Sequence, residues 1–178
     1  TGYVHTEIDG VWLNKYSAAT GVVRSLNTDP SATVCLSGTI SAGTASSTGT
    51  QDGTFMSIVE NAEGTDYTTT PLGAVDCRFQ FQTLTSQLDQ ELRVYAKVKT
   101  GHQESFYLWY SIQSSPATLT TATIWTPLLT INSETFTEQR VPLPSTVAGK
   151  ALMIRFTDSN NATSSTSFVD QLDVDFIG

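Results

Sequence analysis

Two stretches in which apolar residues recur at every second position constrain the fold of this chain more than any other feature. They span 92–99 (LRVYAKVK) and 106–113 (FYLWYSIQ), and a short polar link separates them. A period of two divides a β-strand into two faces. We expect the following residues to face the core: Leu92, Val94, Ala96, Val98, Phe106, Leu108, Tyr110 and Ile112.

The rest of the chain reads as further strands without a helix. Strand-like segments occupy 33–36, 54–60, 75–82, 124–131, 136–143, 151–157 and 168–177, and none has a sustained 3.6-residue period. These features predict an all-β fold, an antiparallel two-sheet β-sandwich of jelly-roll-like type, as a single domain over 1–178. Residues 1–30 hold only short β-like pieces, including 10–13 and 21–23. We expect them to form part of the single domain, as an N-terminal extension of it or as a donated strand.

The charge balance narrows the classes of partner. The formal net charge is −8, which repels phosphate backbones and anionic lipid headgroups, so neither nucleic acid nor a membrane surface is expected as a partner. No apolar run approaches the roughly 20 residues that cross a bilayer, so membrane insertion is not expected. Only 15% of residues are charged, and neutral polar residues are abundant. This composition indicates an extracellular, cell-surface or virion-surface protein.

The two cysteines, Cys35 and Cys77, both lie in strand-like contexts. A disulfide between them would close a long loop and contribute about 4 kcal/mol by the chain-entropy model. The alternative is a pair of buried free thiols in a reducing compartment.

The second face of the alternating stretches is a mixed aromatic and hydrogen-bonding surface. If 75–82, 92–99 and 106–113 are neighbours in one sheet, their outward residues form one ligand or interface face. Its members are Arg78, Gln80, Gln82, Arg93, Tyr95, Lys97, Tyr107, Trp109 and Gln113. Trp and Tyr can stack on the apolar face of a sugar while Gln and Arg satisfy its hydroxyl groups. The alternative is that a neighbouring subunit or the long loops cover these residues.

Acidic residues offer oxygen ligands for a structural calcium ion. Those available in loops and at strand ends are Glu7, Asp9, Asp52, Glu60, Asp66, Asp158 and Asp170, and the favoured metal ligands are Asp170, Asp9 and Glu7. The alternative is that they are solvated surface acids. Strand alternation turns Asp170 inward, where a buried acid needs a cation, an arginine or several donors. Arg155 is a candidate partner for it.

Catalysis finds little support in the sequence. The two histidines, His5 and His102, have no metal-ligand spacing to another histidine or cysteine, and no nucleophile elbow, phosphate loop or metalloprotease helix is present. We therefore expect no enzyme, with a glycan-active enzyme as a minor alternative.

The C-terminal half carries a family resemblance. It runs in the order YLWYSI (107–112), WTPL (125–128), VPLP (141–144), IRF (154–156) and FVD (168–170). This order resembles jelly-roll modules of the carbohydrate-binding and MAM-like kind, and the stretch from 37–43 through 52–54 also resembles β-sandwich modules of phage virion and surface-assembly proteins. The resemblance implies a structural calcium at Asp170, with Gln171 where a second Asp is common.

The function expected from these features is that of a non-catalytic structural or adhesive subunit. It would assemble through strand edges and the aromatic face, with other copies of itself or neighbouring surface proteins as partners. A carbohydrate-binding module with polysaccharide as its partner is the alternative, in which Trp109, Tyr107 and Tyr95 form a stacking platform.

Overall fold

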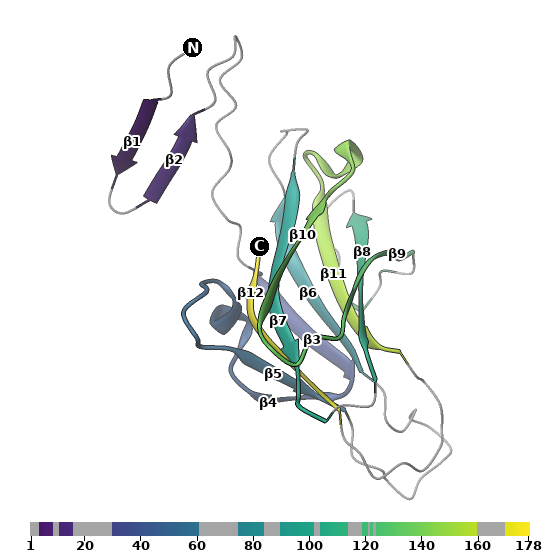
Figure 1. Ribbon diagram of the computed structural model, residues 1–178. Coiled ribbons are helices and arrows are strands. Elements are labelled where there is room, and N and C mark those ends of the chain that lie inside the picture. The colour runs from purple at the N-terminus through teal and green to yellow at the C-terminus, as the bar shows by residue number, and fades with distance from the viewer. Residues whose placement is uncertain are drawn as a thin grey trace, which may run out of the picture.

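The computed structural model describes residues 4–8, 11–15, 30–60, 75–83, 90–101, 104–113, 119–120, 122, 124–159 and 170–178, with backbone alone for 4–8, 11–15, 82–83 and 113. Within them the chain forms strands and two short 3-10 turns, η1 (Ala45–Thr48) and η2 (Ser145–Val147) (Figure 1). None of the helical turns in this part of the chain has the length and apolar character that a membrane crossing requires.

Two five-stranded antiparallel sheets make up the body of the domain. Sheet 1 has the strand order β10-β7-β12-β5-β4, and sheet 2 has the order β3-β6-β11-β8-β9. The strands of sheet 1 are β4 (Thr39–Ala42), β5 (Met56–Val59), β7 (Glu91–Val98), β10 (Thr137–Pro142) and β12 (Gln171–Ile177). The strands of sheet 2 are β3 (Ala32–Ser37), β6 (Asp76–Thr83), β8 (Phe106–Gln113), β9 (Thr126–Ile131) and β11 (Ala151–Asp158).

The chain passes between the two sheets at every connection from β3 to β12 except β4–β5 and β8–β9. This repeated crossing is the connectivity of a jelly roll, in which strands that follow one another in sequence face each other across the core. The predicted all-β, two-sheet sandwich is therefore confirmed. One consequence matters for function: β6, β7 and β8 lie alternately in sheet 2, sheet 1 and sheet 2.

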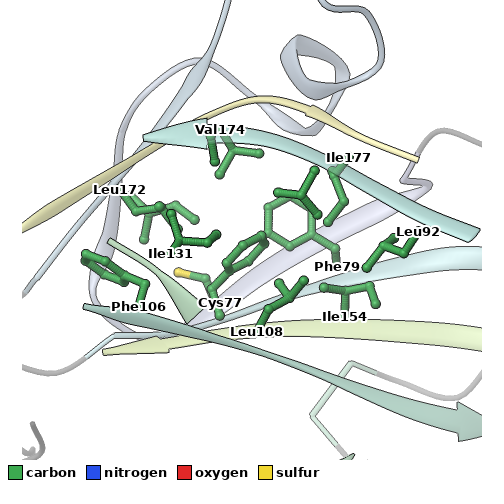
Figure 2. Close-up of a cluster of buried hydrophobic side chains, with 14 of the residues drawn as sticks. Cys77, Phe79, Leu92, Phe106, Leu108, Ile131, Ile154, Leu172, Val174 and Ile177 are labelled. Atoms are coloured by element: carbon green, nitrogen blue, oxygen red, sulfur yellow. The ribbon is translucent and has the colours of Figure 1, made fainter. Parts of the chain in front are cut away.

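The core fills the space between the sheets with alternate residues from both (Figure 2). In β7 every second residue is buried, and Leu92, Val94, Ala96 and Val98 are at most 2% exposed. Within sheet 2, Phe79 of β6 and Phe156 of the neighbouring strand β11 meet edge to face with ring centroids 5.3 Å apart. The core positions expected from alternation are confirmed, although Tyr110 and Ile112 pack only partly buried at its margin.

The disulfide expected from the sequence is present and joins two strands of sheet 2. Cys35 of β3 and Cys77 of β6 stand directly opposite each other in the antiparallel ladder. Because β3 is the edge strand, the bond fastens the edge of sheet 2 to its interior. The Ser/Thr/Gly-rich segment after β3 forms β4 and η1.

The N-terminal residues contain a separate hairpin. β1 (Val4–Ile8) pairs with β2 (Val11–Lys15) in an antiparallel two-stranded sheet that is hydrogen-bonded to neither sheet 1 nor sheet 2. The strand expected near 10–13 corresponds to β2, whereas 21–23 lies outside the described residues. A role for 1–30 as an extension or donated strand stays a prediction.

Candidate functional site

The outward residues expected to form one aromatic face are divided between the two sides of the sandwich. Arg78, Gln80, Tyr107 and Trp109 belong to sheet 2, but Arg93 and Tyr95 belong to sheet 1, together with Lys97. The side chains of Gln82 and Gln113 lie outside the described residues. The prediction of a single pooled face was wrong because β7 crosses to the opposite sheet, so its outward residues point away from those of β6 and β8.

The outer face of sheet 2 is built around an ion triad on neighbouring strands. Arg78 of β6 and Arg155 of β11 are direct cross-strand partners, and both guanidinium groups bind the carboxylate of Asp76. Arg78 Nε and Nη2 each donate to it at 3.0 Å, and Arg155 Nε and Nη2 donate at 2.9 and 2.8 Å. Two bidentate contacts on one carboxylate hold both arginine planes in a defined orientation.

Trp125, which immediately precedes β9, covers this triad. The Arg78 and Arg155 guanidinium carbons lie 5.2 and 5.5 Å from the centre of its ring, within the range of a cation–π interaction. The indole nitrogen donates to the carbonyl of Ala122 at 3.2 Å, and Arg78 Nη1 donates to the carbonyl of Leu119 at 2.9 Å. The bond from Arg78 therefore ties Leu119 to β6, an interior strand of sheet 2.

Two more aromatic side chains continue the surface on β8. Trp109 is the cross-strand partner of Arg155, and its indole nitrogen donates to the hydroxyl of Thr157 at 2.9 Å. Tyr107, which is 38% exposed, meets Trp109 nearly at a right angle with ring centroids 6.2 Å apart. We call the set Tyr107, Trp109, Trp125, Arg78, Arg155 and Asp76 the sheet-2 platform.

The electrostatics of the platform keep the triad charged. Burial alone would raise the pKa of Asp76, but its hydrogen bonds and charge interactions with Arg78 and Arg155 outweigh burial and hold that pKa below its ordinary value. Asp76 is therefore an anion at neutral pH. The triad carries one negative and two positive charges.

Strand alternation in the sequence predicted some residues of this platform but not all of them. Trp109, Tyr107, Arg78 and Gln80 were expected on the outer face from strand parity. Trp125 was not predicted as a site residue. It lies immediately before β9, where strand alternation does not tell which way a side chain points.

On the outer face of sheet 1, Tyr95 belongs to an aromatic cluster. It stacks on Phe136 at 5.2 Å, and Phe136 contacts Phe55 at 5.5 Å. Lys97 Nζ lies 5.0 Å from the Phe136 ring centre and 3.6 Å from a carboxylate oxygen of Asp173. Tyr95 is thus engaged by its own neighbours in sheet 1.

Arg93 is likewise held within sheet 1. It pairs with Glu138 of β10, and its guanidinium carbon lies 5.3 Å from the ring centre of Phe176. Arg93 therefore contributes to the packing of the β10 edge rather than to the sheet-2 platform.

A second candidate site lies where strand ends of both sheets meet. Glu60 follows β5 and Asp170 precedes β12 in sheet 1, while Glu104 precedes β8 and Asp158 ends β11 in sheet 2. Carboxylate oxygens of Glu60, Glu104 and Asp170 lie within 4.8 Å of one another. We call these four residues the acidic cluster.

Backbone amides bind one carboxylate oxygen each of Glu60 and Asp158. The Asp170 amide donates to Glu60 Oε2 at 3.0 Å, and the Val75 amide donates to Asp158 Oδ2 at 2.6 Å. The other carboxylate oxygens, Glu60 Oε1 and Asp158 Oδ1, are buried without a hydrogen-bond partner. Since a buried oxygen without a donor is costly, both positions suit a cation.

The burial of these carboxyl groups also raises their pKa values. Burial, reinforced by the charges of Asp170, Asp158 and Glu104, raises the pKa of Glu60 to about 7 although the Asp170 amide opposes the shift. Burial also raises the pKa of Asp158 to about 7, against the Val75 amide and with the help of Glu104 and Asp170. Without a cation, the cluster holds protons near neutral pH.

These findings correct one expectation about the acids and leave others open. Asp170 is buried at 4% exposure, as alternation predicted, but Arg155 is bound to Asp76 and is not its partner. Asp9 and the side chain of Glu7 lie outside the described residues. Glu104 was not singled out, because only the fold brings the link between β7 and β8 to the end of β5.

Comparisons with known proteins give structural similarity alone. No protein-family model matches the sequence, and no curated protein matches it. One similar structure comes from a study of the promiscuous specificity of carbohydrate-binding modules of the β-sandwich superfamily. It has 11% identity and a TM-score of 0.42 over 82% of this chain and 52% of that chain, so the present chain spans about half of its length. Another is the K1 cleaved adhesin domain of Lys-gingipain from Porphyromonas gingivalis W83, with 12% identity, a TM-score of 0.37 and coverage of 85% and 95%.

Proposed function

We propose that this chain is a non-catalytic, extracellular β-sandwich module that binds carbohydrate on the outer face of sheet 2. The observation that carries the proposal is the pair formed by Tyr107 and Trp109, two rings of different orientation beside hydrogen-bonding side chains. The Cys35–Cys77 disulfide supports a location outside the cytosol.

The geometry of the pair suits a sugar ring. The bond to Thr157 holds the Trp109 indole in one orientation, so little conformational entropy is lost when a ligand stacks on it. Tyr107 stands almost perpendicular and offers both a second apolar wall and a hydroxyl group. A pyranose stacked on Trp109 would have Arg155 as its polar neighbour on the next strand.

The test is retention on a panel of immobilised polysaccharides, with Trp109→Ala compared against the wild type. Tyr95→Ala is the matched control, because it removes an aromatic ring from the outer face of sheet 1. We expect the Trp109 variant to lose roughly tenfold or more in affinity, as for one aromatic stacking contact, and the control to bind normally. Equal binding by both variants, or no retention of the wild type on any polysaccharide, would refute the proposal.

Assembly through strand edges is the second candidate function. All four residues of the edge strand β4 are exposed, and Ile40 is 38% exposed. An exposed edge with an apolar side chain is a template for pairing with another copy. Light scattering across a concentration series tests this candidate: Ile40→Lys should reduce any oligomer, whereas a wild-type monomer at every concentration would eliminate it.

We propose in addition that the acidic cluster holds a structural calcium ion. Glu60, Glu104 and Asp170 offer carboxylate oxygens within 4.8 Å of one another, which are the hard ligands that calcium requires. Glu60 Oε1 is buried without a hydrogen-bond partner, and Asp158 Oδ1 nearby is in the same state. Such an ion would join strand ends of sheet 1 to those of sheet 2. Calorimetric titration of metal-free protein with Ca²⁺ should show binding that Glu60→Gln weakens. An absence of heat and of any thermal stabilisation by Ca²⁺ would exclude the site.

A further inference from the structure

We propose that the ligand of the sheet-2 platform is an acidic glycan, whose carboxylate or sulfate group binds at Arg155. The inference rests on the proposed carbohydrate binding and specifies the class of ligand. It follows from the charges on this face, the accessibility of the two arginines and the spacing between Arg155 and Trp109.

The charge on the platform is opposite in sign to that of the chain. The chain has 9 Lys and Arg against 17 Asp and Glu. Among the described strand residues on the outer face of sheet 2, three side chains are charged: Arg78 and Arg155 are positive, and Asp76 is negative. A local excess of one positive charge is therefore placed next to the exposed Tyr107 and the half-buried Trp109.

The two arginines differ in accessibility. The side chain of Arg78 is 8% exposed, and its bonds to Asp76 and to the Leu119 carbonyl occupy its guanidinium group. The side chain of Arg155 is 26% exposed while its Nε and Nη2 are bound to the same carboxylate. Arg78 is thus the buried counter-ion of Asp76, and Arg155 is the cation that a ligand can reach.

The spacing matches the size of one sugar unit. Trp109 and Arg155 stand directly opposite each other on β8 and β11, and such pairs have Cβ atoms about 5 Å apart. A ring stacked on Trp109 therefore projects a substituent over Arg155. An anionic substituent would form a charge-assisted hydrogen bond there, partly shielded from water by Trp125.

The experiment compares polymers that differ in charge alone. Full-length protein is tested by affinity electrophoresis and calorimetry against de-esterified and fully methyl-esterified homogalacturonan, and against dextran sulfate and dextran. We expect roughly tenfold to hundredfold tighter binding to the charged member of at least one pair. The pair that shows the preference identifies carboxylate or sulfate as the group.

Variants assign the preference to Arg155. Arg155→Met should abolish the difference between charged and neutral polymer, Arg155→Lys should retain most of it, and Arg140→Met on the exposed edge of sheet 1 is the control. If Arg155→Met unfolds, the wild-type comparison and Arg155→Lys still decide the question. Equal affinity for charged and neutral polymers, or a preference that survives in Arg155→Met, overturns this inference and leaves carbohydrate binding intact. Binding to no polymer of any kind overturns both.

Discussion

The free energy of unfolding in calcium-free solution should decrease as the pH rises from 5 to 8, because Glu60 ionises in this range. Glu60 is 5% exposed, and burial raises its pKa from the ordinary value of 4.5 to about 7 in the folded protein. A group whose pKa is higher when folded binds its proton more tightly in the folded state. Its stabilising effect is complete below pH 4.5 and is lost as the pH rises through 7.

The magnitude follows from the shift. A difference of about 2.5 pKa units corresponds to about 3 kcal/mol of unfolding free energy at pH 8. For a chain of this length that is a decrease of roughly 6 to 12 °C in melting temperature. Asp158 is raised in the same direction, but the two carboxyl groups interact, so their contributions are not additive.

The assay is thermal or urea unfolding in EDTA at pH 5 and at pH 8, with Glu60→Gln beside the wild type. The amide side chain carries no charge and still offers an oxygen to the Asp170 amide. We expect the variant to be more stable than the wild type at pH 8, by up to about 3 kcal/mol, and similar to it at pH 5. Glu91→Gln, which removes a charge from an exposed residue, is the control and should change neither value appreciably.

Calcium should reverse the order of the two proteins. The ion would compensate the ionised wild-type cluster, so the wild type should gain more from added Ca²⁺ at pH 8 than Glu60→Gln does. Wild-type stability in EDTA that is flat between pH 5 and 8, or a Glu60→Gln variant that is less stable than the wild type at pH 8, would show that Glu60 is not a buried, strained acid.

Three further predictions concern the fold itself. Replacing both members of the Cys35–Cys77 bond with serine should cost about 4 kcal/mol in urea unfolding, because the bond closes a loop with a sequence separation of 42; an unchanged midpoint would contradict this. Gly43→Ala should destabilise more than Gly53→Ala. Both glycines have positive φ, but a Cβ at Gly43 would meet a backbone carbonyl oxygen at 2.5 Å and one at Gly53 would meet nothing within 4 Å. Phe79→Ala, at a fully buried position, should cost about 3 to 5 kcal/mol, measured in the same way.

The strands and their inward faces could be predicted from local pattern. Alternation in 92–99 places Leu92 and Val98 in the core because the side-chain period of a strand is two and depends on no distant residue. The inward position of Asp170 followed from the same rule. Cys35 and Cys77 could be proposed as a pair because a chain with two cysteines in strands allows one intramolecular disulfide.

The grouping of the strands into sheets could not be predicted in this way. Strand alternation predicts that Tyr95 and Trp109 both point away from the core. It does not say which sheet each belongs to, because that depends on which strands pair. Whether β7 pairs with β6 or with β12 is settled by the summed packing of the whole core.

The sequence by itself determined an all-β sandwich, its core positions and the residue types available for binding, since each is a property of neighbouring residues or of composition. It offered Cys35 and Cys77 as a candidate disulfide, which the fold then joined. Only the tertiary structure decided that Trp125 covers Arg78 and Arg155, and that Glu104 meets Glu60. These pairs lie far apart in the chain, and their contacts arise from strand crossings between two sheets. Local periodicity carries no information about such crossings, so both candidate sites became visible only in the folded chain.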